Sequence, residues 1–130
     1  LEDRGFRRCV AAAQREALEL LAVAAHPVAK LTAIPPRWMP RLLGVPDWLF
    51  GRLAKKVVAI DPHARSSMWD DLEGKRPTEI DYLQGEVVAL ATRLHRAAPI
   101  NAKLVELVRT AEGGGKRDFT AVELQAALGL

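Results

Sequence analysis

Two short stretches place polar side chains where they could act on a substrate. In KRPTEIDYLQG, Glu79 follows a Pro-Thr pair and precedes an apolar run. In RSSMWDD, Ser67 is the second of two serines within a helical pattern, one turn before Asp71. Serine is a mediocre residue inside a helix because its hydroxyl competes for backbone partners. A hydroxyl and a carboxylate can together hydrogen-bond a polar substrate and assist a proton transfer.

Each stretch also has an ordinary structural interpretation. Thr78 is a helix N-cap, Asp81 is the acid three residues later, and Glu79 is a first-turn carboxylate that suits the positive end of a helix. The apolar residues of this helix form one stripe: Ile80, Leu83, Val87, Leu90, Ala91 and Leu94. At ~100° per residue, Glu79 lies about 65° from the centre of the stripe, at the border of the buried face. Local sequence favours a solvent-facing Ser67 and leaves Glu79 open between a cap and a cleft.

The sequence lacks the motifs of several kinds of site. The sequence contains neither G-x-G-x-x-G nor a P-loop, and its glycine run at 113–115 follows a helical pattern rather than a strand. The three histidines, His26, His63 and His95, have no metal-ligand spacing, so no metal site is expected. The single cysteine, Cys9, lies among apolar neighbours, which predicts a small buried residue and fits a reducing, cytoplasmic compartment.

The composition is that of one globular domain spanning residues 1–130. Hydrophobic residues make up 49% of the chain and charged residues 27%. No apolar run approaches the ~18 residues of a membrane span, and no signal peptide is evident. The net charge of +3 is spread among acids rather than gathered in a stripe, so nucleic-acid binding is only a weak alternative.

The hydrophobic spacing predicts an all-α fold, an irregular bundle of about six or seven helices. Asp61-Pro62 is expected to start one helix and Gly74 to end it in a left-handed conformation. Asn101 is expected to cap a later helix, and Thr120 with Glu123 to form a capping box. The predicted helices are 3–25, 47–59, 62–73, 78–96, 102–111 and 121–128.

A proline-dense connector, residues 28–50, follows the first predicted helix and includes the start of the second. Its four prolines forbid one continuous helix and predict short turns between extended pieces. Its apolar residues Trp38, Trp48 and Phe50 are compatible with internal packing, with contact with another domain or with a homodimer.

The run SSMWDDLEGKRPTEIDYLQGEVV, followed by APINAKLVELV, resembles the C-terminal helical domain of ketopantoate reductases (2-dehydropantoate 2-reductases). The family pattern is a Ser-Ser-Met-x-x-Asp helix, a Thr-Glu-Ile-Asp-Tyr-x-x-Gly helix and then Pro-x-Asn. The resemblance implies a fold like the C-terminal domain of 6-phosphogluconate dehydrogenase. It also implies a two-domain enzyme, in which an N-terminal Rossmann domain binds NADPH and the helical domain closes over a 2-oxo acid. Such an enzyme reduces ketopantoate to pantoate, on the route to pantothenate and coenzyme A.

The resemblance also assigns roles to individual residues. Ser67 matches the serine that hydrogen-bonds the substrate, and Glu79 matches the active-site glutamate near the substrate hydroxyl and the catalytic lysine. Asp71 matches the acid of the serine helix, and Asn101 matches a structural or near-site asparagine. Glu79 is therefore the expected catalytic residue, with Ser67, Asp71 and Asn101 as expected substrate-binding residues.

The sequence departs from the family in several places. The dinucleotide-binding loop and the helix that carries the catalytic lysine are absent, and Lys30, Lys55 and Lys56 lie in the wrong context to replace that lysine. Ala64 stands where the family often has an asparagine. The isolated chain is therefore expected to be inactive and to need its own Rossmann domain as partner. The alternative is a stand-alone helical interaction module that has lost the reductase chemistry.

Overall fold

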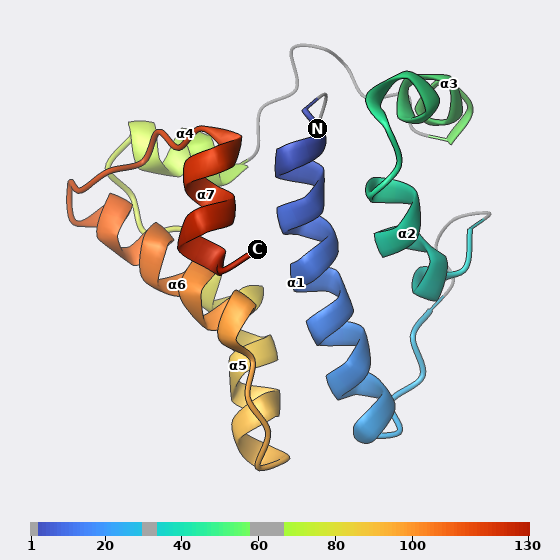
Figure 1. The fold of residues 1–130 in the computed structure, drawn as a ribbon. Helices are drawn as coiled ribbons and strands as arrows, with labels where there is room; N and C mark the ends of the chain where they lie inside the picture. Colours follow the sequence, from blue (N-terminus) through green and yellow to red (C-terminus); the bar gives the residue numbers. More distant parts are fainter. Residues whose placement is uncertain (1–2, 30–33, 58–66) are drawn as a thin grey trace.

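The computed structural model describes residues 3–29, 34–57 and 67–130. Within these ranges the chain forms seven α-helices and two short 3-10 helices, with no β-strand (Figure 1). The predicted all-α class is confirmed, and no Rossmann domain is present in this part of the chain. The elements are α1 (Arg4–Val23), η1 (Pro36–Trp38), α2 (Met39–Leu43), α3 (Asp47–Val57), α4 (Ser67–Glu73), η2 (Ile80–Tyr82), α5 (Gln84–Arg93), α6 (Pro99–Glu112) and α7 (Ala121–Leu128).

Helix α1 stands in the middle of the molecule, with α2 and α3 on one side and α4 to α7 on the other (Figure 1). The side chain of Asp3 caps its first turn by accepting a hydrogen bond of 2.6 Å from the N–H of Gly5. The helix ends slightly earlier than the predicted boundary, because Ala25 adopts a left-handed conformation (φ 54°) before Pro27 is reached.

Small residues let α1 pack closely against its neighbours. A Cβ atom added to Gly5 would lie 2.6 Å from the Cβ of Ala121, so α1 and α7 meet where glycine leaves room. Cys9 is buried as predicted, and burial raises the pKa of its thiol. Further along α1, Leu20 joins the apolar cluster under α5 and the start of α6. That cluster contains Leu20, Ala91 and Ala98, with Val87, Val88, Leu90 and Leu94 packed against it.

The predicted continuous helix over 78–96 is wrong. The 3-10 helix η2 comes first, and a break at Leu83 (φ −106°, ψ −95°) separates it from α5. Leu83 is 46% exposed rather than part of the buried stripe. Because the helical phase is lost at this break, the angle calculated for Glu79 relative to the α5 stripe has no structural basis.

Two other predicted helix ends are also wrong, and one is confirmed. The left-handed residue after α4 is Lys75 (φ 52°) rather than Gly74. Asn101 does not cap α6, because α6 begins at Pro99 and Asn101 lies within its first turn. Thr120 and Glu123 form the predicted capping box of α7. The start signal Asp61-Pro62 lies outside the described residues.

The connector is more helical than its prolines suggest. Pro36 and Pro40 occupy first-turn positions of η1 and α2, where a missing N–H costs no helical hydrogen bond. The prediction of extended pieces is therefore wrong for this stretch. Trp38 and Trp48 are exposed, whereas Phe50 packs within the chain against the guanidinium of Arg7.

A fully buried arginine joins α1 to the connector. Arg7 Nε donates to the carbonyl of Leu43 (3.1 Å), and Nη2 donates to the carbonyl of Val45 (2.9 Å) and to Asp47 Oδ1 (2.7 Å). The guanidinium also lies 4.2 Å from the centroid of the Phe50 ring. These contacts hold the end of α2 and the start of α3 against α1, since buried carbonyls need donors.

We expect Arg7→Met to lower the free energy of unfolding by about 2–4 kcal/mol, because it removes the donors of the Leu43 and Val45 carbonyls and the partner of Asp47. Arg8→Met is the matched control, since Arg8 is exposed on the same helix. Urea denaturation of both variants measures the difference. Equal stability of the two variants would contradict the role given to Arg7.

Candidate functional site

Helix α4 carries two of the predicted site residues on one face. Ser67 is its first residue and is exposed, and Asp71 lies one turn later and is half-buried. Asp71 Oδ1 accepts a hydrogen bond of 3.1 Å from Arg76 Nε, and the backbone N–H of Arg76 donates to the Asp71 carbonyl (2.7 Å). Asp71 therefore holds the loop that leads from α4 toward Glu79.

Glu79 lies at the end of that loop, and its flanking residues are both buried. Thr78 is 9% exposed and Ile80 is 2% exposed, whereas Glu79 itself is exposed. Glu79 makes no capping bond to η2, and its side chain has no hydrogen bond or ion pair within the described residues. Its backbone is thus packed while its carboxylate stays accessible.

The segment around Glu79 is fixed by the last turn of α6. Glu112 Oε1 accepts hydrogen bonds from both the N–H and the hydroxyl of Thr78, each 2.7 Å long. Arg109, one turn earlier, donates to both carboxylate oxygens of Asp81 at 2.6 and 2.5 Å. Thr78 therefore uses its donors on Glu112, and its contact with the Ile80 N–H is a long 3.4 Å.

These hydrogen bonds favour the ionised form of Glu112. The N–H and the hydroxyl of Thr78 both stabilise the ionised form and so lower the pKa of Glu112 below its ordinary value. The nearby Arg109 acts in the same direction. The Glu112 carboxylate therefore stays ionised to a lower pH than an ordinary glutamate, because its pKa is lowered.

Asn101 lies at the opposite end of α6. It is 2% exposed, and its side-chain amide donates to the Ala13 carbonyl (3.2 Å) and to Glu16 Oε2 (2.7 Å). Glu16 also accepts from the N–H groups of Ile100 (3.0 Å) and Asn101 (2.8 Å). A carboxylate from α1 thus caps the N-terminus of α6, where the chain offers no local cap.

The structure does not bring all the predicted site residues together. Asn101 and Glu112 are separated by eleven residues of α6, which is roughly 16 Å along the helix axis. Asn101 therefore lies far from the end of α6 that holds Thr78, and its amide is engaged in the packing of α1 against α6. Ser67 and Asp71 lie in α4, and Glu79 ends the loop that joins α4 to η2.

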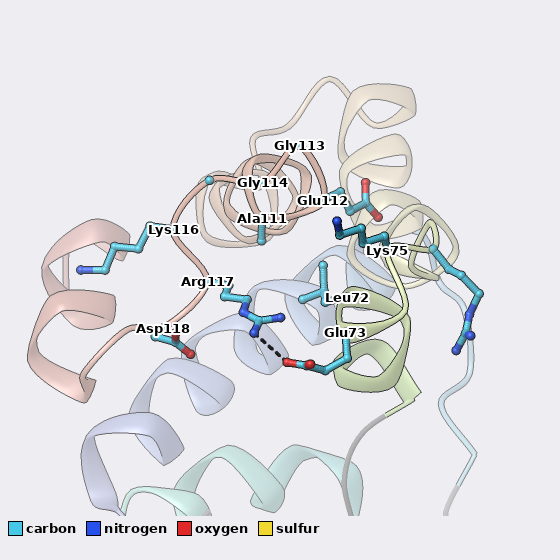
Figure 2. A pocket seen from close by; sticks show the side chains of 12 residues that line it. Leu72, Glu73, Lys75, Ala111, Glu112, Gly113, Gly114, Lys116, Arg117 and Asp118 are labelled. Carbon is cyan, nitrogen blue, oxygen red and sulfur yellow. Dashed lines mark ion pairs between the residues drawn. The ribbon is translucent and has the colours of Figure 1, made fainter.

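A cavity of about 760 Å³ opens beside the same end of α6 (Figure 2). Leu72 and Ala111 contribute apolar surface to it, and Arg117 and Glu73, which also line it, form an ion pair of 2.6 Å. Its cations are Lys75, Arg76, Lys116 and Arg117, and its acids are Glu73, Glu112 and Asp118. The charges are mixed, and Glu79 is not among the lining residues.

Sequence reasoning missed Glu16, Arg109 and Glu112, whose partners lie far along the chain. One signal was available for Glu112. An acid in the last turn of a helix opposes the helix dipole, so its presence there indicates a partner elsewhere.

The described residues contain no cluster of metal-ligating side chains, and their glycine run donates its N–H groups within the chain. They contain no group of three or more His, Cys, Asp or Glu side chains that could hold a metal ion. The glycine run follows α6. The N–H groups of Gly113, Gly114 and Gly115 donate hydrogen bonds to carbonyls of α6, so they do not point toward a phosphate site. Among these residues, no helix is both long and apolar enough to cross a membrane.

The described residues form an all-helical domain that carries both predicted site motifs, at Ser67 and at Glu79. A family model described as "Ketopantoate reductase PanE/ApbA C terminal" matches residues 1–112. The chain therefore belongs to the family of ketopantoate reductase C-terminal domains, as its sequence motifs predicted. Comparisons with curated proteins and with solved structures found no match. Helix α7 lies beyond the matched residues.

We expect Glu16→Ala to lower the free energy of unfolding by about 1–2 kcal/mol, the usual value of a lost helix cap. Glu19→Ala is the matched control, because Glu19 is exposed on the same helix. Denaturation monitored by circular dichroism compares the two variants. A Glu16→Ala protein as stable as the control would show that α6 does not depend on this cap.

We expect Thr78→Val to raise the pKa of Glu112 toward its ordinary value, because valine keeps the N–H donor and removes the hydroxyl. A lowered pKa in the folded state stabilises the fold above the ordinary value of 4.5, and this stabilisation is lost as the pH falls through the folded-state pKa. The stability advantage of the wild type over Thr78→Val should therefore shrink below pH 4.5.

NMR titration of the Glu112 carboxyl carbon and urea denaturation at neutral and acidic pH measure these two effects. Thr92→Val is the control, since the Thr92 hydroxyl bonds only to a carbonyl of its own helix, that of Val88. An unshifted pKa of Glu112 in the wild type would refute the role of Thr78.

Proposed function

We propose that this chain is the substrate-binding domain of an NADPH-dependent 2-oxo-acid reductase that converts ketopantoate to pantoate. Its own N-terminal Rossmann domain would be the partner that carries the cofactor. The observation that carries the proposal is the family match across residues 1–112, which includes Ser67 and Glu79.

The chain's part in the reaction is to bind and orient the substrate. Ser67 is exposed at the start of α4, so its hydroxyl is free to donate a hydrogen bond to a substrate oxygen. Glu79 presents a carboxylate from a packed segment, where it can accept a hydrogen bond from the hydroxyl of the product or orient an ammonium group of the other domain. Asp71 supports both by holding the loop between them through Arg76.

The test requires the complete protein in which this chain follows a dinucleotide-binding domain. Reading the coding sequence upstream of Leu1 establishes whether such a domain and a lysine-bearing helix are present. We expect the complete protein to oxidise NADPH when ketopantoate is added, with the reaction followed by nicotinamide absorbance. The 130-residue chain alone should show no turnover, since its sequence contains no G-x-G-x-x-G motif and none of its lysines lies in the context of the family's catalytic lysine.

We expect Glu79→Gln to reduce kcat by roughly 10²-fold, because a lost orienting contact misplaces the reacting groups. Glu86→Gln is the matched control, an exposed acid in the first turn of α5. Unchanged kcat in Glu79→Gln would remove Glu79 from the mechanism. Turnover of NADPH by the isolated chain, or none by the complete protein with any 2-oxo acid, would overturn the proposed function.

A further inference from the structure

We infer that Glu112 is a positioning residue for Glu79: it holds the backbone of the Thr78–Ile80 segment so that the Glu79 carboxylate projects from a fixed point. The catalytic consequence rests on the proposed function, whereas the structural part stands on contacts within the chain.

The contact joins two residues that are 34 positions apart in the chain. One oxygen of Glu112 accepts both donors of Thr78, at 2.7 Å each. Hydrogen bonds to an ionised carboxylate are about twice as strong as neutral ones. The bonds are partly buried, because Thr78 is 9% exposed. Thr78 is joined directly to Glu79, so restraining both its backbone and its side chain restrains the position from which Glu79 projects.

Helix stability does not account for an acid at this position. Glu112 is the last residue of α6, where the partial negative charge of the helix end disfavours a carboxylate. Its side chain turns instead to the loop before η2. The lowered pKa of Glu112 agrees with this geometry, because a carboxylate that accepts two hydrogen bonds is stabilised in its charged form.

The second anchor of the segment is weaker. Arg109 binds Asp81, two residues after Glu79, but both side chains are more than half exposed. An exposed ion pair contributes little to stability, because water screens its charges. Loss of Asp81–Arg109 should therefore loosen the segment less than loss of Glu112–Thr78.

Two series of measurements test the inference. In the 130-residue chain, amide hydrogen exchange of Thr78 and Ile80 should become at least about tenfold faster in Glu112→Ala, because their local opening no longer breaks the Glu112 bonds. In the complete reductase, Glu112→Ala should reduce kcat by roughly 10- to 100-fold with little change in KM, as expected for a displaced catalytic group. Glu112→Gln keeps an acceptor oxygen, so its amide exchange should be slower and its kcat higher than those of Glu112→Ala.

Glu106→Gln is the matched control. Glu106 is exposed on the same helix, and its carboxylate binds Lys103 on the surface of α6. It should change neither exchange nor kcat. Unchanged exchange in Glu112→Ala would overturn the inference even if the reductase proved inactive. Faster exchange with an unchanged kcat would overturn the positioning role. An inactive wild-type reductase would count against the proposed function, and the exchange measurement would still decide whether Glu112 fixes the segment.

Discussion

The carboxylate of Glu16 at the N-terminus of α6 is the interaction on which the placement of the candidate site depends. Helix α6 begins at Pro99 after Ala98, and neither residue can cap it. Glu16 supplies the missing acceptor from α1 by binding the N–H groups of Ile100 and Asn101 and the side chain of Asn101. The far end of α6 carries the two side chains that hold the segment around Glu79. A change in how α6 docks on α1 therefore moves the candidate site.

Helix α1 binds the two halves of the molecule through two charged residues on opposite faces. Arg7 and Glu16 are nine residues apart, which at ~100° per residue places them about 180° apart around the helix. Arg7 faces α2 and α3, and Glu16 faces α6, in agreement with the central place of α1 (Figure 1). Alanine-rich faces allow close approach but provide little shape to distinguish one packing from another. The directional hydrogen bonds of Arg7 and Glu16 favour one packing of α1 over the others, because a shifted helix would leave buried polar groups unpaired.

The features that sequence predicted are the ones whose partners are near in the chain. The capping box of Thr120 and Glu123 spans three residues, so it can be recognised from spacing alone. The Glu16 cap spans 85 residues and the Glu112–Thr78 contact spans 34, so no local pattern indicates either. The helical phase of Glu79 failed for a related reason. It assumed one regular helix from Thr78 onward, whereas tertiary contacts turn the first residues into a separate 3-10 helix.

The Thr-Glu-Ile-Asp stretch shows how one carboxylate can be both fixed and accessible. Thr78 and Asp81, which local sequence assigned to a helix cap, instead bind Glu112 and Arg109 of α6. Ile80 is buried beneath them. Glu79, between them, makes no capping bond, so the cap interpretation does not explain it. A catalytic residue needs a restrained backbone, because movement of its Cα atom displaces the functional group from the position that the reaction requires. It also needs a free side chain, and among the polar residues of this stretch Glu79 meets both conditions.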